Sequence, residues 1–263
     1  MPKLQVIGGG KMGEALLAGL ITGGWAAAHE MRVVERLPER ADELRERFPG
    51  LAVAEVAGPA EGHVVAVKPG DVPDACQALA EAGSRTPVLS IAAGVTIGRL
   101  EAALADGTPV VRAMPNTPAL VGAGAAAIAA GHAAGEADLA WAERILGAVG
   151  LVVRVDEPLL DAVTGVSGSG PAYVFLVAEA LVEAGVLAGL ARPVSSALVT
   201  QTLLGAARLL DESHEGPEAL RAAVTSPGGT TAAGLRALEA AGVRSAFLEA
   251  VMAATERSRE LGA

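Results

Sequence analysis

The stretch VIGGGKMG, residues 6–13, decides how the N-terminal part of the chain folds. It joins the apolar run LQVI to an Ala- and Leu-rich segment, so its glycines fall between a predicted strand and a predicted helix. Gly8, Gly10 and Gly13 have the GxGxxG spacing, which permits a tight turn, close approach of a pyrophosphate and close helix–strand packing. Free N–H groups and the dipole at the helix start favour an anion. The stretch predicts a dinucleotide-binding unit; a glycine-rich turn without a ligand is the alternative.

Outward from this stretch, short Val-, Ile- and Ala-rich runs alternate with amphipathic segments up to about Arg154. This alternation is typical of a parallel sheet with crossover helices. Strands are predicted at 4–8, 31–35, 64–68, 88–92, 110–114, 125–130 and 151–155, and helices at 12–21, 38–48, 72–82 and 137–149. The sequence therefore predicts an α/β fold in which residues 1–155 form a Rossmann-type doubly wound sheet.

After Asp156 the strand runs stop, and the remainder has the pattern of helices. Prolines in SGSGPAY (167–173) and at 193 mark helix starts. The predicted helix 171–190 is apolar or small on nearly every face, and so short a domain cannot surround several such helices. Residues 156–263 are therefore expected to form an all-helical dimerisation domain; a compact monomeric bundle is the alternative.

Charge and composition narrow the class of protein. The net charge is −10 and basic residues do not cluster, which argues against a nucleic-acid partner. Glu179 and Glu183 interrupt the only candidate membrane span, so we interpret it as a buried helix. The single cysteine, Cys76, cannot form an intramolecular disulfide, and the N-terminus has no signal-peptide pattern. We expect a cytoplasmic protein with no membrane partner and no metal site.

Several residues are placed to meet a dinucleotide. Glu35 at the end of the second strand favours the ribose diol of NAD, whereas the adjacent Arg36 favours the 2′-phosphate of NADP, so the two indicate opposite preferences. Lys68 puts a cation at the carboxyl edge of the sheet, with a surface position as the alternative. The bare backbone of 92–94 suits a nicotinamide. Asn116 can reach into the same cleft, although its loop can equally be an ordinary connection.

The stretch TSPGGTT, residues 225–231, precedes another predicted helix. Successive glycines beside hydroxyls at a helix start form a nest of N–H donors that suits a carboxylate or a phosphate. A helix cap is the alternative. Beyond Lys68 the chain contains no lysine, and its only histidines there, His132 and His214, lie in no motif, so it has no evident base for alcohol oxidation. Reduction of a carbon–nitrogen double bond mainly requires alignment of hydride donor and acceptor.

Seven segments together carry a resemblance that covers nearly the whole chain: VIGGGKMG, VVAVKP, SIAAGVTI, MPNTP, DAVTGVSGSGPAYVF, QTLLGAARLL and SPGGTT. In this order they resemble the pyrroline-5-carboxylate reductases. The resemblance implies NAD(P)H-dependent reduction of 1-pyrroline-5-carboxylate to L-proline, the final step of proline biosynthesis. It implies NADPH as cofactor with NADH as the alternative, and a homodimer through the helical domain that can extend to a decamer of five dimers. Glu35 departs from the Ser or Asn of many members.

The resemblance also implies a site. Gly229 and Thr230 would offer N–H groups to the substrate carboxylate with help from Ser226, Thr231 would bind the ring nitrogen, and Glu157 would lie near the substrate. Ser226 and Thr231 are the predicted catalytic residues; each of these polar residues has a capping or surface role as its alternative. The predicted cofactor-binding residues are Gly8, Gly9, Gly10, Lys11, Met12, Gly13, Glu35, Arg36, Ala66, Val67, Lys68, Pro69, Ala92, Ala93, Gly94 and Asn116.

Two other functions fit parts of the pattern. A β-hydroxyacid dehydrogenase also joins a Rossmann domain to helices, but it is expected to use a lysine in the helical domain, where this chain has none. A non-catalytic nucleotide sensor would bind cofactor without turnover. Such a sensor would usually carry a basic or partner-binding appendage, and the sequence shows neither.

Overall fold

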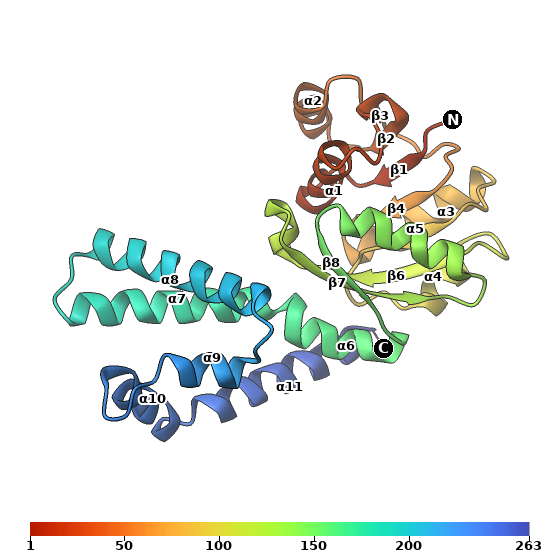
Figure 1. The fold of residues 1–263 in the computed structure, drawn as a ribbon. Helices are drawn as coiled ribbons and strands as arrows, with labels where there is room; N and C mark the ends of the chain where they lie inside the picture. Colours follow the sequence, from red (N-terminus) through yellow and green to blue (C-terminus); the bar gives the residue numbers. More distant parts are fainter. Residues whose placement is uncertain (263) are drawn as a thin grey trace. The chain divides into compact units, whose positions relative to one another are not determined.

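The strands around the glycine-rich turn form one eight-stranded sheet of order β3-β2-β1-β4-β5-β6-β7-β8 (Figure 1). The structure, a computed structural model, describes residues 1–262. The strands are β1 (Leu4–Ile7), β2 (Met31–Val34), β3 (Ala52–Ala54), β4 (His63–Val65), β5 (Val88–Ser90), β6 (Val110–Met114), β7 (Gly124–Ala130) and β8 (Gly150–Arg154). β1 lies between β2 and β4, so the strand order reverses beside the glycine-rich turn. Doubly wound sheets bind ligands at this point.

The last two strands depart from the predicted parallel pattern. β7 runs antiparallel to β6, and β8 runs parallel to β7. The connection 115–123 is too short for the crossover that a parallel pair needs, so the chain must turn back. The carboxyl ends of β7 and β8 therefore lie at the edge where the other six strands begin.

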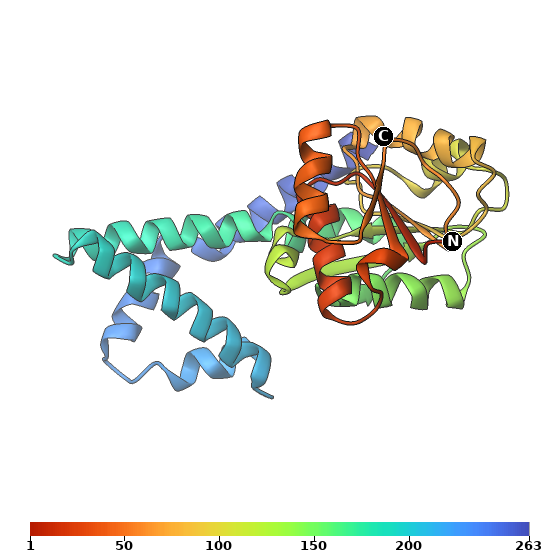
Figure 2. The same ribbon diagram turned by 90° about the horizontal axis from the view of Figure 1, so that it is seen from above.

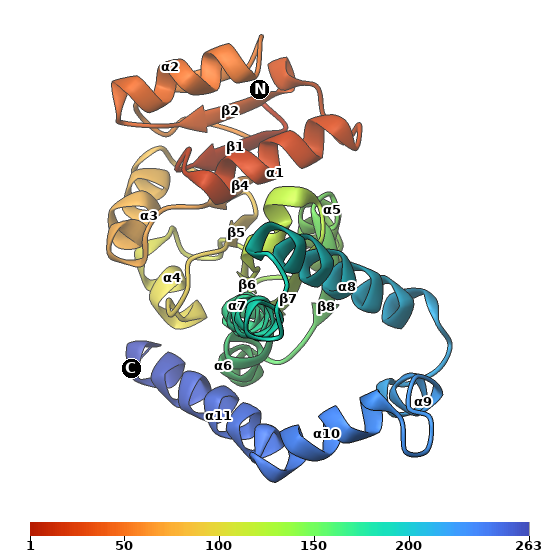
Figure 3. The same ribbon diagram turned by 90° about the vertical axis from the view of Figure 1, so that its left-hand side faces the viewer.

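Helices cover both faces of the sheet (Figure 3). One face carries α1 (Lys11–Thr22), α2 (Pro38–Arg47) and α5 (Glu136–Gly147), and the other carries α3 (Val72–Glu81), α4 (Ile97–Ala103) and α6 (Leu160–Val163). Leu16, Leu17 and Leu20 of α1 are fully buried at helical spacing. Each contributes about 2 kcal/mol through burial. The predicted α/β class is confirmed, whereas the short elements β3 and α4 were not predicted.

The chain divides into two compact units, which we call the sheet unit and the helical unit. The sheet unit comprises Met1–Ser169 together with the C-terminal residues from Met252 onward, and the helical unit comprises Gly170–Val251. The sheet unit therefore extends past the last strand, which ends at Arg154. A division of function between residues 1–155 and 156–263 stays a prediction.

The helical unit exposes most of its apolar side chains. It contains α7 (Gly170–Leu187), α8 (Arg192–Glu212), α9 (Pro217–Ala223), α10 (Thr230–Ala240) and the first part of α11 (Val243–Gly262). α7 and α8 pack side by side (Figures 1 and 2). By length and composition the stretch Glu157–Leu187 could cross a membrane, and its apolar window is unburied. The prediction of a buried helix is therefore wrong for the single chain, in which Phe175 is 67% exposed.

A neutral histidine lies at the amino edge of the sheet. His63, the first residue of β4, is fully buried. Its Nδ1 lies 3.2 Å from the amide nitrogen of Gln5, which can only donate, so Nε2 carries the proton and donates to Ser84 Oγ at 2.8 Å. Burial disfavours the charged ring and lowers the pKa of His63 to about 4.

We expect this histidine to make the fold sensitive to mild acid. In the unfolded chain the ring takes a proton near pH 6.5, whereas in the folded chain it stays neutral down to about pH 4. The free energy of unfolding should therefore fall as pH drops from 6.5 towards 4, by at most about 3 kcal/mol. Urea unfolding across this range should show a shallower slope for His63→Gln than for the wild type. A matched control is His132→Gln, because that ring is 91% exposed; equal slopes for both variants would contradict the assignment.

Candidate active site

The glycine-rich turn between β1 and α1 has the shape that a pyrophosphate needs. Gly8 has φ +102°, and a Cβ there would lie 2.7 Å from the carbonyl oxygen of Ala66. A Cβ on Gly13 would collide with the carbonyl oxygen of Gly8. Gly10, the N-cap of α1, is exposed and has open space where a Cβ would project. The first and third glycines thus serve close packing, and the second leaves room for a ligand above the helix start.

Glu35 is fixed against this turn. Its Oε2 accepts the N–H of Gly9 at 3.0 Å, and its Oε1 accepts the N–H of Leu37 at 2.9 Å. The carboxylate is thereby held at the end of β2, beside the turn. Arg36 is exposed at the same strand end. The structure brings the two predicted determinants of cofactor choice together at one end of the site.

A second arginine, Arg40, contacts the backbone of the glycine-rich turn, and the sequence did not predict this contact. Arg40 of α2 donates from Nε to the carbonyl oxygen of Gly9 at 2.7 Å, and its guanidinium also pairs with Glu14 and Glu43. Its side chain is only 23% exposed. No local motif marks this residue, because it reaches the turn from a helix 31 positions away.

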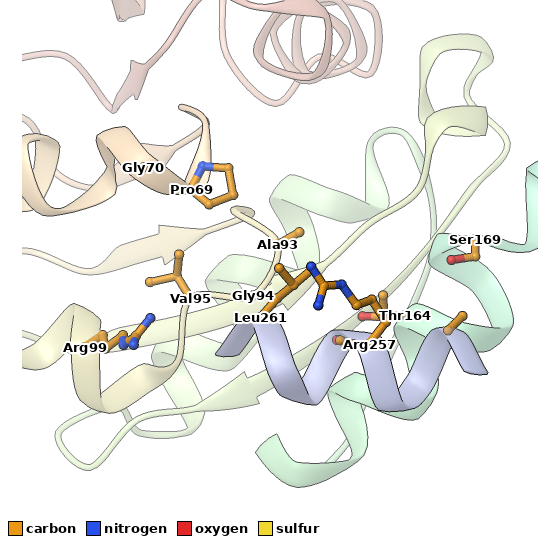
Figure 4. Close-up of a pocket in the computed structure, with 12 residues that line it drawn as sticks. Pro69, Gly70, Ala93, Gly94, Val95, Arg99, Thr164, Ser169, Arg257 and Leu261 are labelled. Carbon is orange, nitrogen blue, oxygen red and sulfur yellow. The ribbon is translucent and has the colours of Figure 1, made fainter. Parts of the chain in front are cut away.

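The loops after β4 and β5 line a cavity of about 530 Å³ within the sheet unit (Figure 4). Pro69 and Gly70 come from the first loop, and Ala93, Gly94 and Val95 come from the second. Ala66 and Val67 are half-buried, Lys68 is exposed and Ala92 is buried. The predicted nicotinamide-side segments thus converge at the carboxyl edge of β4 and β5, on the far side of the switch point from Glu35.

The other wall of this cavity comes from segments that the sequence did not connect to the site. The end of α11 contributes Ala254, Arg257, Ser258 and Leu261, and Figure 4 shows the last of these beside Gly94. Ser258 is buried and donates to Asp161 Oδ1 at 2.6 Å, which holds α11 on the sheet unit. None of the described lining residues is acidic. The cavity therefore suits a neutral or anionic group.

Both polar atoms of the Asn116 side chain bond backbone groups of the protein. Its side-chain oxygen accepts the N–H of Ala125 at 2.8 Å, and its nitrogen donates to the carbonyl oxygen of Ser167 at 3.0 Å. Ser167 belongs to a π-helical turn, Thr164–Gly168, and π-turns are frequent at functional sites. Asn116 thus ties the loop after β6 to the turn that contributes Thr164 to the cavity. Its predicted contact with the cofactor stays a prediction.

The Glu157 carboxylate bonds two groups of the sheet unit. Its Oε1 accepts the backbone N–H of Ile97 at 2.7 Å and pairs with Nη1 of Arg112 at 2.8 Å. These contacts place its carboxylate between the start of α4 and the side chain of Arg112 on β6. They give Glu157 a role that the sequence did not predict.

The stretch 225–231 lies in the helical unit and forms a turn that leads into α10. Gly228 has φ +71°, and the N–H of Gly229 donates to the carbonyl oxygen of Ser226 at 3.0 Å, so this N–H closes the turn instead of remaining open. Gly229 is the N-cap of α10 and supplies no side-chain cap. The first-turn N–H groups of Thr230 and Thr231 therefore lack a capping side chain. Both threonines are exposed, as an anion-binding helix start requires.

Two family models match the chain, one for each part of the fold. Residues 3–94 match a family described as NADP oxidoreductase, coenzyme F420-dependent. Residues 157–261 match a family described as pyrroline-5-carboxylate reductase dimerisation. The glycine-rich turn lies in the first segment, and the turn before α10 lies in the second.

Individual relatives match over the full length. The chain is 48% identical to the pyrroline-5-carboxylate reductase of Synechocystis over 263 residues, which covers 99% of the chain and 98% of that protein. A solved pyrroline-5-carboxylate reductase from Coxiella burnetii superposes with a TM-score of 0.94 at 37% identity, covering 100% of this chain and 99% of that one. The Plasmodium falciparum pyrroline carboxylate reductase, solved with NADP bound, gives 0.87 at 30% identity and covers 100% and 98%. With such relatives and a glycine-rich turn shaped for a dinucleotide, the chain belongs to the pyrroline-5-carboxylate reductase family.

Proposed function

We propose that the chain reduces 1-pyrroline-5-carboxylate to L-proline with a nicotinamide cofactor, as the final step of proline biosynthesis. The observation that carries the proposal is the start of α10. Two glycines precede first-turn N–H groups that no side chain caps. Such a helix start binds a small carboxylate without any basic side chain. The family's name specifies a substrate of this kind.

The sheet unit supplies the cofactor half of the site. The glycines of the 6–13 turn leave open space where a pyrophosphate would bind, and the loops after β4 and β5 line the cavity where the nicotinamide would lie. When bound, the reduced nicotinamide would supply the hydride. We assign the cofactor mainly to residues 1–155, with the end of α11 closing the cavity, and the substrate and the dimer contact to residues 156–263.

The helical unit supplies the substrate half of the site. The N–H groups of Thr230 and Thr231 hold the carboxylate, with the hydroxyl of Ser226 beside them, and Gly229 provides a bare backbone for close approach. The Thr231 hydroxyl hydrogen-bonds the ring nitrogen, which arrives protonated and keeps its proton as the double bond is reduced. The residues therefore orient the ring and need no strong acid or base.

For the cofactor we propose NADPH with NADH also accepted. Arg36 offers a cation to the 2′-phosphate, but the fixed carboxylate of Glu35 repels that group and can instead accept from the ribose diol. The preference for NADPH should therefore be modest. The NADP bound to the Plasmodium relative is consistent with this choice.

Glu35→Ser should shift the preference towards NADPH. Loss of the carboxylate removes repulsion from the 2′-phosphate and an acceptor for the diol, so the ratio of kcat/KM for NADPH over NADH should rise about tenfold. Steady-state kinetics with both cofactors measures this ratio. Arg36→Gln should move it the other way; equal ratios in all three proteins would show that neither residue selects the cofactor.

We assign the exposed apolar side chains of the helical unit to a second copy of the chain. Phe175 and Leu176 of α7 are 67% and 66% exposed, and Leu198 of α8 is 55% exposed. Exposure on this scale typically marks a protein or membrane contact, and the match to a dimerisation family favours the protein. A homodimer in the cytoplasm, able to extend to a decamer, is the proposed state, with no membrane or nucleic-acid partner.

A direct assay tests the proposed function. Purified protein supplied with 1-pyrroline-5-carboxylate should consume NADPH, measured as loss of absorbance, and should form proline in equal amount. Absence of turnover with both NADPH and NADH would overturn the proposal. Activity on a 3-hydroxy acid would point to the dehydrogenase alternative instead.

A further inference from the structure

A short loop connects β5 to α4 and carries much of the cavity wall. Residues 91–96, which we call the 91–96 loop, lie between Ser90 at the end of β5 and Ile97 at the start of α4. Ala93, Gly94 and Val95 line the cavity. Gly94 has φ +72°, a backbone conformation that bends the loop. The position of this wall therefore depends on how the two ends of the loop are held.

One ion pair joins the two ends of the 91–96 loop. Ser90 is the register partner of Arg112 on the neighbouring strand β6. Arg112 pairs through Nη1 with Glu157 Oε1 at 2.8 Å, and the same oxygen accepts the N–H of Ile97 at 2.7 Å. A continuous series of contacts thus links Ser90, just before the loop, through Arg112 and Glu157 to Ile97, just after the loop.

The surroundings of this ion pair strengthen the attraction between its two charges. The side chain of Arg112 is 8% exposed and that of Glu157 is 30% exposed, so water screens the pair only partly. A carboxylate that accepts an N–H at a helix start is also favoured by the helix dipole. Removal of the carboxylate would leave Arg112 with an unpaired buried charge and α4 with an open N–H group.

The topology separates Glu157 from the carboxyl edge of the sheet. Because β7 and β8 run opposite to the other strands, β8 ends where the parallel strands begin. The chain returns through α6 and the π-helical turn before Ser167 meets Asn116 after β6. Seven residues separate Glu157 from Thr164 at the start of that turn, roughly 10 Å at the helical rise.

We propose that Glu157 and Arg112 are positioning residues that hold the 91–96 loop in the shape that receives the nicotinamide half of the cofactor. They act through the backbone at Ser90 and Ile97 and touch neither cofactor nor substrate. The inference rests on the proposed function, because it takes the cavity as the cofactor's. It replaces the predicted role of Glu157 as a substrate contact.

A double-mutant cycle tests the coupling. Glu157→Gln, Arg112→Gln and the double variant are compared with the wild type by fluorescence titration of NADPH and by steady-state kinetics. Each single variant should raise the dissociation constant for NADPH about tenfold, and the double variant should raise it no further, because both residues act as one unit. The KM for 1-pyrroline-5-carboxylate at saturating NADPH should stay within twofold of the wild-type value. Glu136→Gln, which breaks an exposed ion pair with Arg154, is the matched control and should bind NADPH normally.

Each other outcome has a definite meaning. A lower melting temperature with unchanged NADPH affinity in Glu157→Gln would overturn the proposal, because the pair would then only stabilise the fold. A rise confined to the KM for 1-pyrroline-5-carboxylate would also overturn it, in favour of direct substrate contact. If Arg112→Gln does not fold, Arg112→Met, which removes the charge and suits the buried position, takes its place in the cycle. Wild-type protein that binds NADPH without turnover would refute the proposed function and leave this binding test intact.

Discussion

Thr231→Ala is expected to lower kcat about 100-fold while the dissociation constant for NADPH stays unchanged. The Thr231 hydroxyl is proposed to align the ring nitrogen, an interaction of the kind whose loss costs about two orders of magnitude in rate. Its backbone N–H, proposed to bind the carboxylate, survives the substitution. The KM for 1-pyrroline-5-carboxylate should therefore change less than kcat.

Single-turnover measurement with saturating NADPH separates this effect from product release. Thr22→Ala, at the exposed end of α1, is the matched control for loss of a surface threonine hydroxyl and should react at the wild-type rate. A normal kcat in Thr231→Ala would show that the Thr231 hydroxyl takes no part in the reaction. Equal losses in kcat and NADPH affinity would indicate that the substitution disturbs the whole site.

Gly10→Ala and Gly13→Ala should fail in different ways. Gly10 has φ −66° and open space at the Cβ position, so alanine fits the free protein and the melting temperature should barely change. The added methyl group would occupy the space left for the pyrophosphate, and the dissociation constant for NADPH should rise about 30-fold. Isothermal titration calorimetry measures this rise.

At Gly13 the added methyl group meets the carbonyl oxygen of Gly8 instead. The strand and the helix must separate to relieve this contact, which should cost about 2 kcal/mol of folding free energy. Urea unfolding should therefore distinguish the two variants before any cofactor is added. A Gly10→Ala protein that binds NADPH with normal affinity would place the pyrophosphate elsewhere.

The parts of the fold that the sequence could predict depend on residues that lie close together in the chain. The glycine-rich turn and the start of α10 each depend on residues within one short stretch, where glycine spacing and backbone geometry decide the structure. All strands except β3 were predicted to within a few residues. β4 and β5 end earlier than predicted, at Val65 and Ser90, because the chain leaves the sheet there to form the cavity loops.

The features that sequence could not predict depend on residues far apart in the chain. Arg40 reaches the turn from a helix 31 positions away, and Ser258 meets Asp161 across 97 positions. The reversal at β7 depends on a short connection rather than on the pattern of the strand. Glu157 was predicted from its place before DAVTGVSGSGP, but its partners lie 45 and 60 residues away, at Arg112 and Ile97. Periodicity and spacing carry no information about such pairings.

The return of α11 has a consequence for synthesis. Leu261, which lines the cavity, and the buried Ser258 follow the last strand, which ends at Arg154, by more than 100 residues. The nucleotide-binding half therefore remains without one wall until α11 is made, although its strands emerge first.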